Sequence, residues 1–186
     1  MRGLGQKTGV RSQESECGLA AMVICAVALA ACSSTKPAPL KEASTELLSD
    51  VQTADSRGAL QLVHGFEQVE QRAWRWTNRT FGLVLKTPVG AARHGAGLRL
   101  EFTLPSQVLS ASGPVELVAV VNGYSLGPQV YNDTGVHVYQ RDVPPEALRT
   151  DAVLVEFSTG KEFRPLEESG RELALVANRV ALLGHE

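Results

Sequence analysis

The chain has 186 residues, which is room for one domain of ordinary size together with a targeting segment. Its 18 basic and 20 acidic residues are close to balance, and no block of Lys and Arg follows residue 32. This composition argues against a nucleic-acid partner, which would need clustered positive charge to neutralise phosphates. It also excludes strong electrostatic attraction to anionic lipid headgroups.

Residues 1–31 have the layout of a signal peptide. The first part is polar and carries Arg2, Lys7 and Arg11, whereas residues 18–31 are uncharged and apolar. This apolar run of 14 residues is shorter than the roughly 18–20 residues that a membrane-spanning helix needs. We therefore expect the segment to be a leader rather than a permanent transmembrane helix.

The residues Leu29-Ala30-Ala31-Cys32 resemble the lipobox of bacterial lipoproteins. The resemblance implies cleavage before Cys32, acylation of this cysteine, and attachment of the mature chain to a membrane of the cell envelope through lipid. Ser33 implies the outer membrane if the cell is Gram-negative. Simple secretion after an A-x-A-like cleavage site is the alternative. Because Cys17 and Cys25 lie in the leader, neither an internal disulfide nor a thiolate metal site is expected in the mature chain.

Residues 32–58 are expected to form a tether. The segment SSTKPAPL at residues 33–40 has the composition of an extended linker. Residues 41–55 contain good helix formers and an apolar patch at Leu47, Leu48 and Val51, a pattern compatible with a short helix.

Residues 59–186 show short alternating runs bounded by turn residues, the pattern of an all-β domain. Two strands with one buried face are predicted by their alternating apolar residues: Phe81, Leu83 and Leu85 in the first, and Leu98, Leu100, Phe102 and Leu104 in the second. Further strands are predicted at 115–121, 134–141, 152–158 and 173–183, and the glycine-rich stretch around Gly90, Gly95 and Gly97 is predicted to be a loop between strands. Asn122-Gly123 is a strong hairpin signal, with Tyr124 opening the return strand.

These strands predict an antiparallel β-sandwich of the jelly-roll kind. An α+β domain is the alternative, because residues 144–149 and 173–183 are also compatible with helix.

No catalytic, cofactor or metal site is predicted. The chain has neither G-x-S-x-G nor H-E-x-x-H, and its four histidines are scattered. A hydrolase would instead need two close carboxylates, such as a pair among Glu67, Glu70, Asp133 and Glu162.

The segment Trp74-Arg75-Trp76-Thr77 is the most informative cluster for ligand binding. Residues two apart share one face of a strand, so the tryptophans lie together and Arg75 points to the other face. Large rings most often fill a core, and this is the favoured interpretation. The alternative is a platform on which exposed indoles stack against the C–H faces of sugars.

A second candidate is the aromatic set Tyr124, Tyr131 and Tyr139, which follows the hairpin. Loops at one end of a sandwich often bind ligands, so these tyrosines are predicted to line a groove. A solvated rim is the alternative.

Several segments together resemble the galactose-binding-like and carbohydrate-binding-module-like jelly rolls of bacterial envelope proteins: Gly65-Phe66, the tryptophan cluster, the two alternating strands and Val118-x-Val120-x-Asn122-Gly123. The resemblance implies a non-enzymatic envelope lipoprotein whose domain binds a glycan or another envelope component. A structural or assembly lipoprotein that contacts envelope proteins through a sheet edge or an apolar patch is the alternative.

Overall fold

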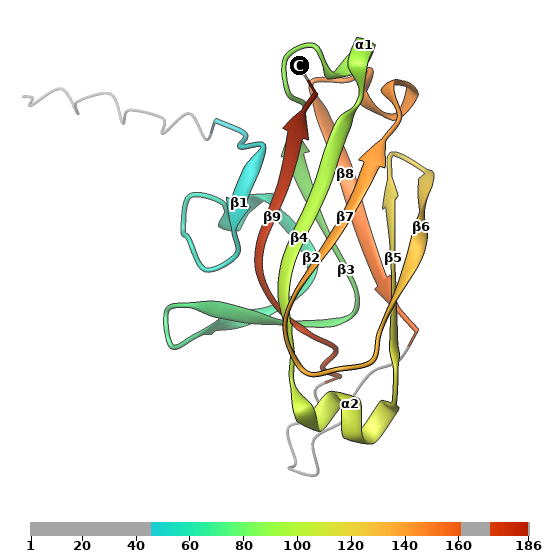
Figure 1. Ribbon diagram of the computed structural model, residues 1–186. Coiled ribbons are helices and arrows are strands. Elements are labelled where there is room, and N and C mark those ends of the chain that lie inside the picture. Colours follow the sequence, from blue (N-terminus) through green and yellow to red (C-terminus); the bar gives the residue numbers. More distant parts are fainter. Residues whose placement is uncertain (1–45, 161–171, 186) are drawn as a thin grey trace, which may run out of the picture. The chain divides into compact units, whose positions relative to one another are not determined.

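The computed structural model describes residues 46–160 and 172–185 (Figure 1). Strands account for most of these residues, and the helical segments are short. In chain order the elements are β1 (Asp50–Gln52), the 3-10 turn η1 (Ala59–Gln61), β2 (Leu62–Glu70), β3 (Trp74–Lys86), α1 (Ala91–His94), β4 (Ala96–Leu104), α2 (Ser106–Ser112), β5 (Val115–Val121), β6 (Tyr124–Tyr131), β7 (Gly135–Val143), the 3-10 turn η2 (Pro145–Leu148), β8 (Ala152–Thr159) and β9 (Val176–Gly184).

The strands form one antiparallel sheet of nine strands, ordered β6-β5-β8-β3-β9-β4-β7, with β1 added to β9 and β2 added to β3. The sheet curls so that its two halves face each other across the core. Phe102 of β4 contacts Tyr131 of β6 with ring centroids 4.9 Å apart, and Tyr139 of β7 lies 6.2 Å from Phe157 of β8. The predicted all-β, antiparallel fold is confirmed.

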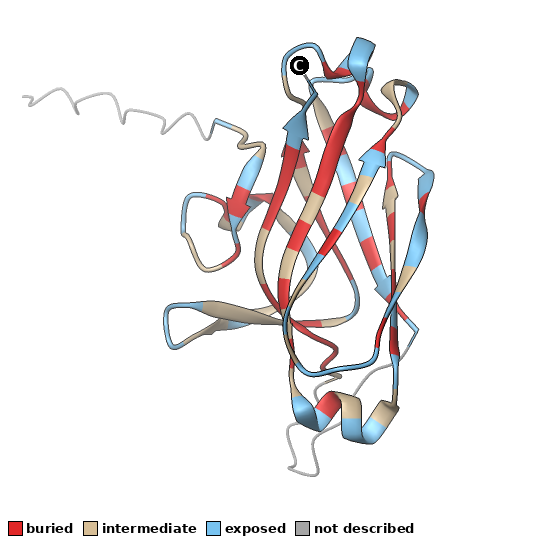
Figure 2. Cartoon of the chain, viewed as in Figure 1, coloured by how far each residue is buried: buried red, intermediate tan, exposed pale blue. Residues whose placement is uncertain are grey.

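The core is built from the inward residues of the predicted strands. Buried positions alternate with exposed ones along β8 and with partly buried ones along most of β4, and exposed positions alternate with less exposed ones along β7, as Figure 2 shows. All seven of the alternating apolar residues in β3 and β4 that were predicted to be inward are 0% exposed. Period-two alternation was therefore a reliable indicator of the buried face, because burial of apolar surface is the main driving force for packing the sheet.

The β5–β6 connection is the predicted hairpin turn. Asn122 and Gly123 both have positive φ, 46° and 85°, as a type I′ turn requires. The Asn122 side chain also links the turn to its surroundings: its Nδ2 donates to the Ala147 carbonyl at 2.9 Å, and its Oδ1 accepts from Leu154 N at 3.0 Å. The turn is thus fixed to η2 and β8 as well as to its own strands.

Side chains close the seam between β6 and β7, the two ends of the strand order. No ladder pairing joins these two strands. Instead, the Tyr139 hydroxyl lies 3.1 Å from the carbonyls of both Leu126 and Gly127, and Arg141 donates to the Pro128 carbonyl at 2.9 Å. Hydrogen bonds from side chains therefore take the place of the missing backbone ladder.

The β-domain begins earlier than the predicted boundary at residue 59. Residues 50–52 form β1, and Val51 is fully buried in the core. The Gln61 amide fixes this segment, since its Oε1 accepts from Leu48 N and its Nε2 donates to the carbonyls of Leu48 and Val84. The short helix expected within residues 41–55 is wrong for the described part, residues 46–55, because pairing with β9 satisfies the backbone there. Residues 1–45 lie outside the described part of the chain.

Two short helices were not predicted. Residues 91–94, expected to be loop, form the single turn α1, and residues 106–112 form α2 between β4 and β5. In residues 46–160 and 172–185, none of the helices has the length and apolar character needed to cross a bilayer.

Candidate functional site

The tryptophans stand at the start of a row of side chains on one face of β3. Strand geometry places Trp74, Trp76, Asn78 and Thr80 on the face opposite Thr77 and Phe81, both of which are 0% exposed. Both indoles are half-buried, and Trp76 also packs against the edge of the core. The tryptophans are therefore neither fully buried core residues nor a fully open platform.

A polar groove of about 500 Å³ adjoins this row. Residues from β2, β3 and the approach to β9 line it: His64, Gly65, Asn78, Arg79, Thr80 and Glu172. The groove contains the kinds of group that bind hydroxyls, namely amide, hydroxyl, guanidinium and imidazole.

Gly65 shapes the groove by letting β2 press against β3. Its φ is +73°, and a Cβ at this position would lie 2.0 Å from the Thr80 carbonyl oxygen. Any side chain here would be both strained and blocked by backbone. The glycine thus brings His64 close to the outer face of β3.

The His64 ring lies over Gly82. A Cβ on residue 82 would be 2.7 Å from His64 Nε2, so the glycine provides the space that the imidazole occupies. The same nitrogen lies 3.6 Å from Glu156 Oε1 on β8. This contact with the carboxylate helps to hold His64 at the border of the groove.

Asn78 and Arg79 are held in place by neighbouring groups. The Asn78 amide nitrogen, oriented toward its two acceptors, donates to Glu67 Oε1 at 3.0 Å and to the Glu172 carbonyl at 3.1 Å. Arg79 is exposed, and its Nε donates to the Thr159 carbonyl at 3.2 Å. Continuing the period-two row from Trp74 and Trp76 would have identified Asn78 and Thr80 from the sequence, but Arg79 would have been missed.

Arg75 has a structural role on the other face of β3. Its Nε donates to the Thr53 carbonyl at 2.7 Å and its Nη1 to the Glu67 carbonyl at 2.8 Å. It borders a smaller hollow of about 160 Å³ lined mainly by residues 59–66. The predicted orientation of Arg75, away from the tryptophans, agrees with these contacts.

The predicted groove of three tyrosines is not formed, and this expectation is corrected. Tyr139 is 0% exposed and Tyr131 is 6% exposed, whereas Tyr124 is 44% exposed on β6. The first two rings fill the interior at the β6–β7 seam, and the Tyr131 hydroxyl donates to the Val138 carbonyl at 3.1 Å. Burial raises the pKa of Tyr131 to about 12 and also raises the pKa of Tyr139. Ligand binding by Trp74, Trp76 and Tyr124 stays a prediction.

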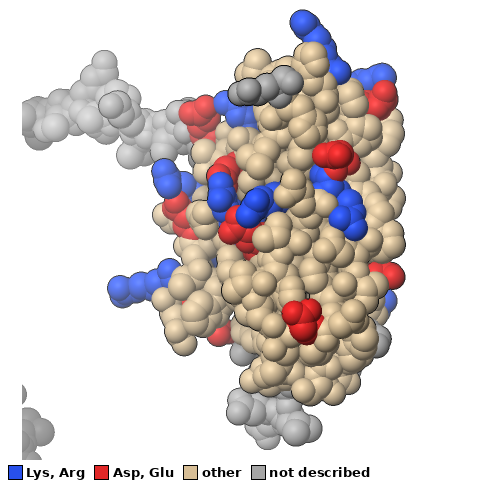
Figure 3. All heavy atoms as spheres, in the orientation of Figure 1, with Lys and Arg blue, Asp and Glu red and all other residues tan. Residues whose placement is uncertain are grey.

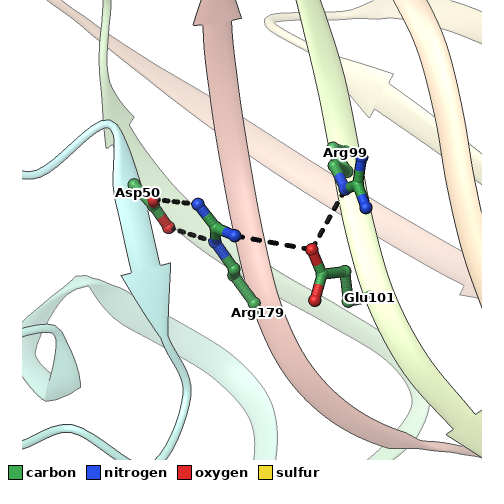
Figure 4. Close-up of polar contacts among 4 residues, drawn as sticks. All are labelled: Asp50, Arg99, Glu101 and Arg179. Atoms are coloured by element: carbon green, nitrogen blue, oxygen red, sulfur yellow. Dashed lines mark hydrogen bonds and ion pairs between the residues drawn. The ribbon is translucent and has the colours of Figure 1, made fainter.

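A network of four charged residues crosses β1, β9 and β4 on the outer surface of the sheet (Figure 4). Arg179 forms an ion pair with Asp50 through two nitrogens, and its Nη1 lies 3.5 Å from Glu101 Oε1, which also accepts from Arg99 Nε at 3.0 Å. The Asp50 hydrogen bonds raise the pKa of Arg179. Basic and acidic residues are also interspersed elsewhere on the face seen in Figure 3. The network is therefore internally compensated and leaves little net charge for a ligand.

The part of the chain that the structure describes contains no group of three or more His, Cys, Asp or Glu residues arranged to hold a metal ion. The predicted lipidation residue Cys32 lies outside the described residues, as does Glu162, one of the carboxylates considered for a hydrolase.

No protein-family model and no curated protein sequence matches this chain. Among solved structures, it is similar to the CBM36-1 domain of a multidomain xylanase from the hindgut metagenome of Trinervitermes trinervoides, at 9% identity and a TM-score of 0.40 over 67% of this chain and 89% of that one. It is also similar to a carbohydrate-binding module, CBM36, in complex with calcium and xylotriose, at 8% identity and a TM-score of 0.42 over 73% of this chain and 99% of that one.

A third similar structure is dimeric latent PorU from Porphyromonas gingivalis, at 14% identity and a TM-score of 0.43 over 76% of this chain. Only 13% of PorU is covered. Likeness at this level assigns the chain to no family, and the candidate site therefore depends on its own geometry.

Proposed function

We propose that this chain is a non-catalytic, glycan-binding protein whose site is the outer face of β3 and the adjoining groove. The proposal depends on one observation: two partly exposed indoles, Trp74 and Trp76, continue along one strand face into Asn78 and Thr80 beside a polar groove of about 500 Å³. Indole faces would stack on the C–H faces of sugar rings, and the amide and hydroxyl groups would bind sugar hydroxyls.

The length of the row suits an extended chain of sugars better than a single ring. Thr80 lies six positions after Trp74, which corresponds to about 20 Å of strand. A groove that is open rather than enclosed also admits a polymer from the side. We therefore expect oligosaccharides to bind more tightly than monosaccharides.

A glycan array probed with the purified full chain, followed by calorimetry on the best oligosaccharide, tests the proposal. Trp74→Ala is the decisive variant because Trp74 packs less against the core than Trp76 does. Loss of one stacking indole is expected to weaken binding about tenfold or more. Val89→Ala, which alters a fully exposed side chain before α1, is the matched control.

Thermal melts of both variants separate a binding defect from unfolding. Absence of binding on the array, or unchanged affinity in a folded Trp74→Ala variant, would refute the proposed function.

We further propose that lipid on Cys32 attaches the protein to a membrane of the cell envelope, the outer membrane if the cell is Gram-negative. The lipobox-like sequence Leu29-Ala30-Ala31-Cys32 supports this proposal. Intact-mass analysis of membrane-fraction protein tests it. A mass corresponding to a chain that begins at Cys32 and carries lipid should be found in wild type and lost in Cys32→Ala, whereas an unmodified soluble chain would contradict the proposal.

Contact with envelope proteins is the second candidate function. Three valines on the strands that border the seam support it, because Val130, Val136 and Val138 are 51%, 75% and 36% exposed. Exposed apolar side chains beside sheet edges are typical of protein-binding surfaces. Val136→Lys should abolish co-purification of an envelope protein without changing glycan affinity.

A further inference from the structure

We propose that the ligand is an acidic glycan and that Arg79 binds its anionic group. This inference depends on the proposed function, because it concerns the charge preference of the same groove. The class of ligand would be an oligosaccharide that carries a carboxylate or a phosphate.

The carboxylates around the groove already interact with other residues of the protein. Glu67 accepts from Asn78, and Glu156 lies against His64. Glu70 and Glu172 also have interaction partners. These acidic groups are therefore less available to a ligand than their number implies.

Arg79, by contrast, has no charged partner among the described residues. It lines the groove and is exposed, and its Nε donates to a neutral group, the Thr159 carbonyl, at 3.2 Å. Among residues 46–160 and 172–185, no carboxylate forms an ion pair with it. The guanidinium thus carries a positive charge that no carboxylate among the described residues pairs with directly.

The attachment of Arg79 suits it to recognition. The Thr159 side chain is buried, and its hydroxyl donates back to the Arg79 carbonyl at 3.3 Å. The Nε bond and this return bond hold both ends of the residue to β8. Holding a guanidinium in place lowers the entropic cost of a two-point bond to a planar carboxylate or a phosphate.

Arg179 differs from Arg79 because it has carboxylate partners within the protein. Arg179 lies between Asp50 and Glu101 and is satisfied within the protein (Figure 4). Arg72, at the exposed tip of the β2–β3 hairpin two residues before Trp74, adds a second positive charge near the far end of the row. An anionic oligosaccharide lying along the row would have Arg79 beside the groove and Arg72 near the hairpin tip.

The test is a glycan array with matched pairs: uronic-acid oligosaccharides and their methyl esters, and phosphorylated sugars and their dephosphorylated forms. The full chain should bind the acidic member of at least one pair about tenfold more tightly than the neutral member. Arg79→Gln should remove that preference, so that the acidic and neutral members of each pair bind this variant equally. Arg93→Gln, which neutralises an exposed arginine on α1, should behave like wild type.

Salt provides an independent readout. The preference for acidic members should fall between about 50 and 500 mM NaCl in wild type, because salt screens exposed charges. In Arg79→Gln, acidic and neutral members should bind equally at every salt concentration. Equal binding of acidic and neutral members, or an unchanged preference in Arg79→Gln, overturns this inference and leaves the proposed function standing. Absence of binding to every glycan overturns the proposed function itself.

Discussion

The hydroxyl of Tyr139 provides a direct test of how the sheet closes. Tyr139→Phe keeps the buried ring and its contact with the Arg141 guanidinium, 5.0 Å from the ring centroid, and removes only the oxygen that donates to Leu126 and Gly127. Those two carbonyls lie on β6, which has no ladder partner on the side of β7. The substitution therefore isolates the side-chain bonds that bridge the seam.

We expect the substitution to lower the free energy of unfolding by about 1–2 kcal/mol. A typical hydrogen bond contributes about 1 kcal/mol net, and buried acceptors left without a donor cost more. For a domain of this size the loss corresponds to a fall in Tm of roughly 3–8 °C. It also corresponds to a fall of about 0.5–1 M in the urea midpoint, at a slope near 2 kcal/mol/M.

Urea unfolding followed by tryptophan fluorescence measures the change. Tyr124→Phe is the matched control, because Tyr124 is 44% exposed on the same strand pair, and it should stay within about 0.5 kcal/mol of wild type. Equal stability of Tyr139→Phe and Tyr124→Phe would refute the idea that this hydroxyl closes the seam.

Three further predictions concern Tyr131, Gly65 and Gln61. The pKa of Tyr131 is raised to about 12 in the fold, whereas a tyrosine in an unfolded chain ionises near 10. The free energy of unfolding should therefore fall by roughly 2–3 kcal/mol as pH rises from 10 to 12. Urea titrations in which Tyr131→Phe removes none of this loss would contradict the assignment. Gly65→Ala should destabilise the protein by about 3 kcal/mol or more, measured by thermal melting, because its Cβ would overlap the Thr80 carbonyl; a near-native Tm would show that β2 can move away freely. Gln61→Leu should cost about 2–3 kcal/mol, because three partly buried hydrogen bonds to backbone groups are lost, and faster hydrogen exchange at the Leu48 amide is the accompanying sign.

The strands with strict alternation could be predicted from sequence with near-correct bounds. Residues 115–121 were predicted as a strand and are β5, and the Asn122-Gly123 turn adopts the expected backbone. These segments are local problems, since alternation fixes which face is buried and turn chemistry fixes how two strands join. Tertiary context does not have to be known.

β2 was missed because its pairing with β3 is irregular. Three register shifts interrupt the ladder between Leu62 and Val69, so buried and exposed positions do not alternate there. The short strand β1 was hidden for another reason. Three residues are too few for a periodic signal, and their helix-forming neighbours favoured a helix. Pairing with β9, which the sequence does not reveal, makes the segment a strand.

The candidate site was half predictable. Trp74 and Trp76 were proposed from their spacing, but Arg79 could not be, because its proposed role depends on a groove made by β2, β3 and Glu172. The prediction of a groove lined by tyrosines was wrong for a topological reason. Sequence shows that Tyr131 and Tyr139 precede and follow a turn, but it does not show that β6 and β7 become the two ends of a closed sheet.

The position of β1 also has a mechanical consequence. It is the first strand of the folded domain, so any tension applied through the chain before residue 46 loads β1 before it loads the rest of the sheet. Only three residue pairs join it to β9, but buried Val51 and the Asp50–Arg179 ion pair reinforce that short contact. β1 is therefore the strand at which pulling from the N-terminal side would begin to unfold the domain, and the ion pair from Arg179 helps to hold it in place.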